Sequence, residues 1–143
     1  MIKIEKQDIG RCVQILSRQI KRRIDEVVSK YDVTSVQCAI IEFISYIGEK
    51  GDAFAKDIES NFNMRRATVA EVLSLMEKND LIKREISSKD ARLKKIVLTE
   101  KSLKIKESFE RDIKRVENQL VQNFTEQEKQ EFFRLINKMS NNL

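Results

Sequence analysis

Residues 61–98 of this chain read NFNMRRATVAEVLSLMEKNDLIKREISSKDARLKKIVL, and this stretch decides the fold. In its first half, apolar residues recur every three or four positions, which predicts a helix from about Arg65 to Lys78. Alternation in residues 81–86 and 94–98 then predicts two short strands. The polar segment between these strands predicts a hairpin with a long charged loop.

A shorter helix is predicted directly before this one, with Ala55, Ile58 and Phe62 facing inward. Asn63 follows it, and asparagine tolerates the left-handed backbone conformation that a tight turn between two helices needs. Two helices joined by such a turn and followed by a hairpin are typical of a winged helix-turn-helix, which places its second helix in the major groove of DNA.

Long helices with apolar stripes are predicted on both sides of this segment. The stripe residues are Ile9, Val13, Leu16, Ile20, Ile24, Val27 and Tyr31 in the first helix, Ile105, Phe109, Ile113, Val116 and Leu120 in the fifth, and Phe132, Leu135, Ile136 and Met139 in the last. Capping-box patterns that begin at Thr34 and at Thr125 predict two of the helix starts.

The predicted fold is therefore mainly α with a small β-wing: a winged helix-turn-helix domain joined to a helical dimerisation domain. Residues 33–102 form the predicted DNA-binding domain, and residues 1–32 and 103–143 form the predicted dimerisation region. The stripes of the end helices have no partner in the middle domain, which favours a homodimer because paired DNA half-sites need two readers. Packing of these stripes within a monomer is the alternative.

Composition narrows the possible functions. Lys and Arg number 28 against 23 Asp and Glu, and the formal net charge of +5 permits a polyanionic partner. The absence of proline and the presence of only three glycines disfavour an all-β fold. The chain has no histidine, which removes the usual general base and a common zinc ligand. We therefore expect no enzyme, with no catalytic residue, no metal ion and no cofactor.

The two cysteines, Cys12 and Cys38, lie in apolar-patterned segments. The opening residues MIKIEKQDIG predict no export signal, so free thiols of a cytoplasmic protein are favoured over a disulfide. The sequence contains no run of about 18 uncharged apolar residues, so no membrane-spanning helix is predicted. Redox sensing by Cys12 is one hypothesis, but its neighbour Val13 lies on the apolar side, and a buried cysteine is usually an inert small hydrophobe. Whether either cysteine senses oxidants stays open.

The candidate DNA-binding residues are Arg65, Arg66, Thr68, Lys89, Arg92 and Lys94. An arginine fork matches the two acceptors of guanine, and a threonine suits a phosphate or a thymine methyl group. Arg92 at the hairpin tip suits the minor groove, where arginine is attracted by the negative potential. Asp90 is interpreted as a brace for Arg92 or as a loop cap. A solvated helix start and an ordinary solvated hairpin are the alternatives for these cations.

Several motifs, taken in order, resemble those of the MarR family of bacterial transcriptional regulators over essentially the full length. They are Thr34-Ser35-Val36-Gln37, Met64-Arg65-Arg66-Ala67-Thr68-Val69, Leu81-Ile82-Lys83-Arg84, Asp90-Ala91-Arg92 and Val97-Leu98-Thr99-Glu100-Lys101. The resemblance implies a triangular homodimer joined by its terminal helices. It also implies a repressor that binds a pseudo-palindromic operator in double-stranded DNA and that a small-molecule effector or oxidation releases. In that arrangement Arg92 contacts the minor groove, and residues 65–68 face the major groove.

An effector pocket is expected between the dimerisation helices and the DNA-binding domain. Its candidate lining residues are Ile20, Ile24, Ile40 and Phe43, which suit a hydrophobic core equally well.

The chain departs from the family pattern at several positions. Glu59 stands where alanine is common, and Asn63, Asp80 and Ser102 stand where glycine is common. The acids around the expected recognition surface are Glu71, Glu77, Asp80 and Glu85. They favour the alternative function, a protein-interaction module or antirepressor that keeps the fold without specific DNA recognition.

Overall fold

The computed structural model describes residues 8–143. The expectations for residues 1–7, namely the lack of an export signal and the start of the dimerisation region, lie outside the described residues. The elements are α1 (Ile9–Val28), a 3-10 turn η1 (Ser29–Tyr31), α2 (Ser35–Gly48), α3 (Ala55–Phe62), α4 (Arg66–Lys78), β1 (Ile82–Ile86), β2 (Lys94–Leu98), α5 (Glu100–Leu120) and α6 (Glu126–Asn141). The prediction of a mainly α fold with a small β-wing is confirmed.

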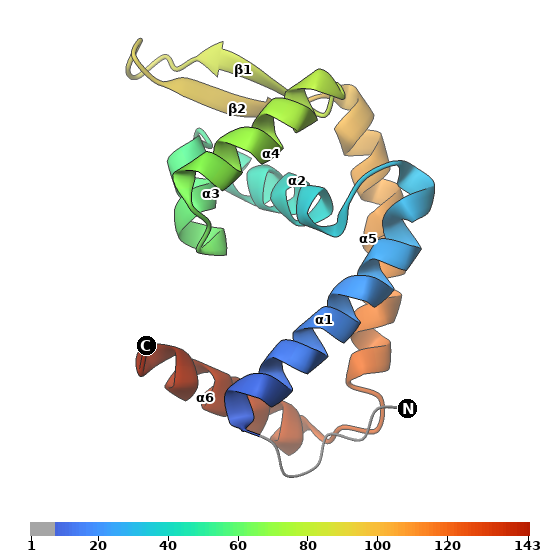
Figure 1. Cartoon of the computed structure of the whole chain (residues 1–143). Helices are drawn as coiled ribbons and strands as arrows, with labels where there is room; N and C mark the ends of the chain where they lie inside the picture. Colours follow the sequence, from blue (N-terminus) through green and yellow to red (C-terminus); the bar gives the residue numbers. More distant parts are fainter. Residues whose placement is uncertain (1–7) are drawn as a thin grey trace.

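Figure 1 shows two groups of elements. Helices α2, α3 and α4 pack together with the antiparallel β1–β2 hairpin, which we call the wing, and these elements form the winged-helix unit. Helices α1 and α5 lie side by side and run away from this unit, and α6 lies at their far end. In the part of the chain that the structure describes, no helix is long and apolar enough to cross a membrane.

Threonine side chains fix the starts of three helices. The Thr34 hydroxyl accepts a hydrogen bond from the Gln37 N–H at 3.1 Å, and the Gln37 side chain accepts one from the Thr34 N–H at 3.0 Å. Thr125 and Glu128 form the same reciprocal pair at the start of α6. These capping boxes satisfy backbone donors that would otherwise lack partners, and both were predicted.

The two left-handed residues around α4 explain why asparagine and aspartate stand there. Asn63 ends α3 with φ 49°, as its residue type predicted. Asp80, just after α4, has φ 58°. Glycine is the residue best suited to such a backbone, and Asn and Asp are the next best tolerated because their short side chains bond locally.

The core of the winged-helix unit is built on the inward face of α4. Val69, Leu73 and Met76 are completely buried there, as predicted. They belong to one cluster with Ile40 of α2 and Ile58 of α3. This cluster fixes α4 against the rest of the unit and leaves its opposite face in solvent.

A polar cluster joins the winged-helix unit to the long helices. The Tyr31 hydroxyl donates to the Asp112 carboxylate and also lies 3.2 Å from the Ser108 carbonyl of α5. Lys30 pairs with Asp112 at 2.7 Å, and the Tyr31 ring meets the Phe109 ring edge-on at 6.4 Å. The hydrogen bonds from Lys30 and Tyr31 lower the pKa of Asp112. This junction holds the end of α1 against the middle of α5.

Three details differ from the sequence-based expectations. The first helix ends at Val28, which is fully buried, and Tyr31 lies in the 3-10 turn. Helix α6 buries none of its apolar residues completely, and Phe132 remains 47% exposed, because no element among residues 8–143 fully covers that face. Ile86 is 66% exposed, because the outer end of the wing extends beyond the core.

The left-handed turn at Asn63 gives a stability test. Asn63→Ala should cost about 1 kcal/mol of unfolding free energy, because a Cβ without a local hydrogen bond is disfavoured at this φ. Asn63→Gly should cost nothing, because glycine adopts this conformation freely. Urea unfolding at fixed protein concentration measures both. Asn61→Ala, the same change at an exposed position in the last turn of α3, is the matched control, and equal losses at the two positions would contradict the prediction.

Candidate nucleic-acid interface

The first turn of α4 carries three of the predicted site residues. Arg65 is the N-cap residue, Arg66 is the first helical residue, and Thr68 follows within the turn. All three are exposed. The structure therefore brings them together at one helix end, on a helix whose other face is held by the core.

Neither arginine forms an ion pair within residues 8–143. A helix N-terminus carries a partial positive charge, so two adjacent cations there are unfavourable in the chain alone. An anionic partner would remove this cost.

The wing carries the other three residues. Arg92 donates from Nε and Nη2 to the two carboxylate oxygens of Asp90 at 3.2 and 3.1 Å, and the Arg92 backbone N–H donates to the same carboxylate. The hydrogen bonds from Arg92 lower the pKa of Asp90. Asp90 therefore has both of the roles that the sequence left open, because its carboxylate braces the Arg92 side chain and also caps the loop at the Arg92 backbone N–H. The Arg92 side chain nevertheless stays 90% exposed, so the brace orients the guanidinium without hiding it.

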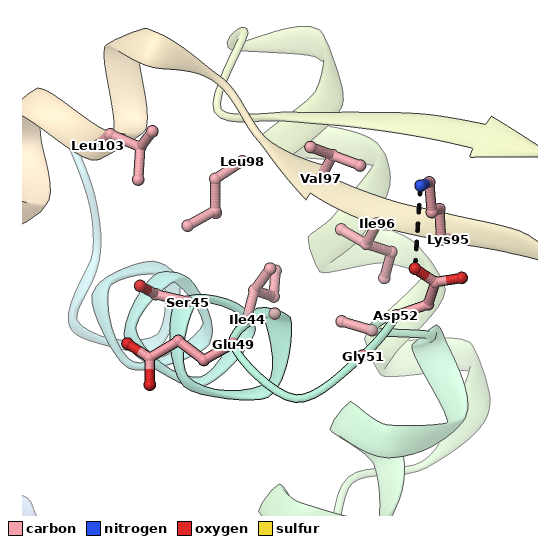
Figure 2. Close-up of a pocket in the computed structure, with 12 residues that line it drawn as sticks. Ile44, Ser45, Glu49, Gly51, Asp52, Lys95, Ile96, Val97, Leu98 and Leu103 are labelled. Atoms are coloured by element: carbon pink, nitrogen blue, oxygen red, sulfur yellow. Dashed lines mark ion pairs between the residues drawn. The ribbon is translucent and has the colours of Figure 1, made fainter. Parts of the chain in front are cut away.

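The lysines of the wing divide into two kinds. Lys89 in the loop and Lys94 at the start of β2 are exposed. Lys95 instead turns toward Asp52, with Nζ 3.8 Å from one carboxylate oxygen, and Figure 2 shows this pair. Its second partner is Glu85 at 3.9 Å. The charge of Lys95 is therefore compensated. Lys89 and Lys94 form no ion pair among residues 8–143, and Arg92, although paired with Asp90, keeps its side chain exposed.

The residues that attach the wing were missed by sequence reasoning. Ala53, in the loop between α2 and α3, forms a β-bridge with Ile96, whose N–H donates to the Ala53 carbonyl at 2.7 Å. Asp52 accepts a hydrogen bond from the buried Ser87 hydroxyl at 3.2 Å. The sequence showed only a turn after Gly48 here, because a one-residue bridge has no periodicity from which to predict it.

Two of the four acids that favoured an interaction module are neutralised by neighbouring cations. Glu77 pairs with Arg84 at 3.3 Å, and Glu85 pairs with Lys95. Glu71 and Asp80 form no ion pair within the described residues. The acidic character of the surface is therefore smaller than the sequence suggested.

Several hollows lie outside the candidate interface, and two of them have a more apolar than polar lining. One, of about 390 Å³, lies between the end of α2, strand β2 and the start of α5, with Ile44, Lys95 and Leu103 among its walls (Figure 2). The other, of about 480 Å³, lies between α1, α5 and α6 and is mostly apolar.

Of the two alternatives for Ile20, Ile24, Ile40 and Phe43, pocket lining or hydrophobic core, the structure of this chain shows the core for three. Ile40 is completely buried in the core, and Ile24 and Phe43 pack against that core. Only Ile20 lines a hollow, the apolar one between α1, α5 and α6. The sequence placed these residues on the inward face of a helix because they belong to its apolar stripe. An apolar stripe does not distinguish residues of a packed core from residues that line a cavity.

The cysteines have different environments. Cys38 is fully buried, and burial raises its pKa to about 12, so its thiol is a poor nucleophile at neutral pH. Cys12 is half-buried on α1. Among residues 8–143, no group of three or more Cys, Asp or Glu side chains could hold a metal ion.

Comparison with solved structures identifies the fold. The transcription regulator MarR from Oenococcus oeni PSU-1 is 29% identical over 94% of this chain and 99% of that chain, with a TM-score of 0.76. MepR from S. aureus in a complex with DNA is 22% identical over 97% and 99%, with a TM-score of 0.88. The transcriptional regulator SlyA is 18% identical over 95% and 94%, with a TM-score of 0.84.

These neighbours are MarR-family transcriptional regulators, so the predicted MarR-like winged-helix fold is confirmed. They are regulators and not enzymes, in agreement with the prediction that this chain is not an enzyme. No family model matches the chain, and no curated protein matches its sequence.

The brace in the wing can be tested by NMR titration of the Asp90 carboxyl carbon. Its pKa should lie below the ordinary aspartate value, and Arg92→Ala should raise it, because the guanidinium hydrogen bonds stabilise the carboxylate. The brace is thus complete at neutral pH and is lost as the pH falls through the lowered pKa. Lys89→Ala, next to Asp90, is the control and should leave the titration unchanged. An unaltered Asp90 titration in Arg92→Ala would show that the brace does not form in solution.

Proposed function

We propose that this MarR-like protein is a dimeric, sequence-specific DNA-binding transcriptional regulator. The observation that carries the proposal is the pair of exposed cationic sites on the winged-helix unit, one at the start of α4 and one on the wing. In Figure 1 the start of α4 and the tip of the wing lie at the same side of the unit. A helix in the major groove and a wing on the adjacent backbone or minor groove would use both sites at once.

In this proposal Arg65, Arg66 and Thr68 contact base edges and phosphates of the major groove. Lys89, Arg92 and Lys94 contact the DNA backbone or the minor groove, with Arg92 aimed by Asp90. Arg92 has a carboxylate partner in Asp90, but its side chain remains 90% exposed. Arg65 and Arg66 have no carboxylate partner among the described residues, which leaves them available for phosphate.

The proposed division of the chain assigns residues 33–102 to DNA binding and residues 1–32 and 103–143 to dimerisation. Its support is the exposed apolar surface at the far end of the long helices. The exposed apolar side chains there include Leu16 of α1, Leu120 at the end of α5, Phe124 between α5 and α6, and Phe132, Phe133 and Leu135 of α6. A patch of this kind is unusual on a monomer and is typical of an interface. A second copy of the chain would cover this apolar patch. It would also supply the second DNA-binding unit that a pseudo-palindromic operator needs.

The alternative function, a protein-interaction module or antirepressor, rested on the acids around α4. It is weakened because Glu77 and Glu85 are engaged with Arg84 and Lys95. The arginines at the start of α4 also have no role in that alternative.

We further propose that the protein is a cytoplasmic repressor released by a small-molecule effector. The hollow of about 390 Å³ next to β2 is a suitable place for an effector, because its walls include Lys95 and Ile96, which attach the wing to the rest of the unit. A ligand there that displaced Lys95 from Asp52 would free the wing. The identity of the effector cannot be derived from this lining, which mixes apolar and charged groups.

DNA binding is tested with the purified protein and genomic duplex fragments over a series of salt concentrations. Affinity should fall steeply as salt rises, because phosphate contacts release counterions. Arg92→Ala should weaken binding to many sequences and reduce the salt slope by about one, whereas Arg65→Ala or Arg66→Ala should change sequence preference at a cost of about 1–3 kcal/mol.

Arg111→Ala is the matched control, since Arg111 is an exposed arginine on α5 away from the interface. It should keep both affinity and preference. If wild-type protein bound no duplex at low salt, the proposed function would be wrong.

Dimerisation is tested by placing a charge on the apolar face of α6. Phe132→Asp should convert the dimer to a monomer in analytical ultracentrifugation and weaken operator binding, because the carboxylate would be buried without a partner. Gln130→Asp adds the same charge on the opposite, exposed face of the same helix and should remain dimeric. A dimer that tolerates Phe132→Asp would place the interface elsewhere.

A further inference from the structure

Glu71 occupies the middle of the outward face of α4. Val69, Leu73 and Met76 define the buried face of this helix. At about 100° per residue, Glu71 lies nearly opposite the centre of that buried face. It is exposed, and so are Ala67 and Ser74, its neighbours one turn before and one turn after. If α4 enters a groove, Glu71 is therefore directed at the groove floor and not at the rim.

Within residues 67–77, Glu71 is the longest polar side chain on that face, and the exposed Lys78 lies on the same side two turns later, at the end of α4. Residues 67–77 contain no lysine or arginine. Three nearby outward positions carry short side chains, Ala67, Ala70 and Ser74, and a fourth carries Leu75, which is 49% exposed. The short side chains would let this part of the helix approach the base pairs, so that a carboxylate on a two-carbon stem could reach the base edges. The arginines at the helix start lie five and six positions before Glu71, so they would contact a different part of the half-site.

The charge of Glu71 is not compensated within the described chain. Glu77 on the same helix pairs with Arg84, and Glu85 on β1 pairs with Lys95, but Glu71 forms neither an ion pair nor a side-chain hydrogen bond among residues 8–143. An ionised carboxylate brought between DNA strands is repelled by phosphates and loses hydration. Only a hydrogen-bond donor on a base edge could offset this cost.

Base chemistry determines which donor fits. In the major groove guanine offers two acceptors, and thymine offers an acceptor and a methyl group. Adenine has an amine donor, but its N7 acceptor lies beside that amine and would repel the second carboxylate oxygen. Cytosine offers its N4 amine with no acceptor of its own beside it.

We propose that Glu71 is a specificity-determining residue that selects cytosine by accepting a hydrogen bond from its N4 amine at one position of each half-site. The inference rests on the proposed function, because it requires α4 to enter the major groove. It adds a role that the cationic residues cannot supply. Attraction between arginine and phosphate acts on every sequence, whereas an acid on the groove floor penalises every base that lacks a correctly placed donor.

The test is selection of preferred sites from a randomised duplex library by wild type, Glu71→Ala and Glu71→Gln. Wild type should fix cytosine at one position of each half-site. Glu71→Ala should lose that preference by about tenfold while leaving the other positions unchanged. It should also bind random duplex more tightly at low salt, because a repulsive charge has been removed. Glu71→Gln should shift the same position toward adenine, which a glutamine amide recognises through N6 and N7.

Glu107→Gln is the matched control, since Glu107 is an exposed acid on α5 that changes the net charge equally. It should give the wild-type selection. Circular dichroism checks that the Glu71 variants stay folded, which is expected at an exposed helical position.

The inference is overturned if Glu71→Ala keeps the cytosine preference, or if it weakens binding equally on all sequences. Failure of wild type to bind any duplex would overturn the proposed function itself. The two failures are therefore distinguishable.

Discussion

The burial of one face of α4 is the constraint on which the rest of the winged-helix unit depends. Each of its three fully buried side chains, Val69, Leu73 and Met76, contributes about 1.5–3 kcal/mol relative to exposure. An exposed ion pair such as that of Lys21 with Asp25 is worth at most about 1 kcal/mol. Apolar burial therefore fixes the position and rotation of the helix, and its outward residues follow from that rotation. The chemistry of the outer face can change without changing the fold.

The wing is held by weaker and more local means. Its inner end is anchored by the buried Ile82 and Ile96 and by the backbone bridge to Ala53. Its outer end has Ile86 and Leu93 in solvent and is braced only by polar contacts such as that of Asp90 with Arg92. Segments with few buried contacts open at low free-energy cost. The winged-helix unit thus combines α4, which is fixed by the core, with a wing whose outer end is held less firmly.

Much of the fold could be predicted from the sequence because its determinants are local. The stripe periods, the capping boxes at Thr34 and Thr125, and the tolerance of Asn63 for a left-handed turn all act within a few residues. The failures are non-local. The sequence could not show that Lys95 turns inward to Asp52, because that pair joins segments far apart in the chain. The sequence also could not show that the apolar face of α6 stays exposed in the described chain. An apolar stripe indicates that a helix face is suited to burial, but it does not indicate which surface packs against that face.

The candidate site shows the same division. The sequence identified Arg65, Arg66, Thr68, Lys89, Arg92 and Lys94 as its members, and the structure places all six at exposed positions of α4 and the wing. Their contacts with DNA stay predictions. The sequence did not identify Ala53 and Ser87, which attach the wing, because neither residue type suggests that role.

The junction of Tyr31, Lys30 and Asp112 has a mechanical consequence. It clamps the chain where α1 leads into the winged-helix unit, against an α5 of 21 residues, which is about 30 Å long. A rotation of about 10° at one end of a rod of this length displaces the other end by about 5 Å. Successive base pairs are about 3.4 Å apart along the duplex axis, so such a tilt would move a recognition helix by more than one base pair. In the proposed dimer, the stiffness of this junction would therefore limit how precisely the two DNA-binding units match the helical repeat of DNA.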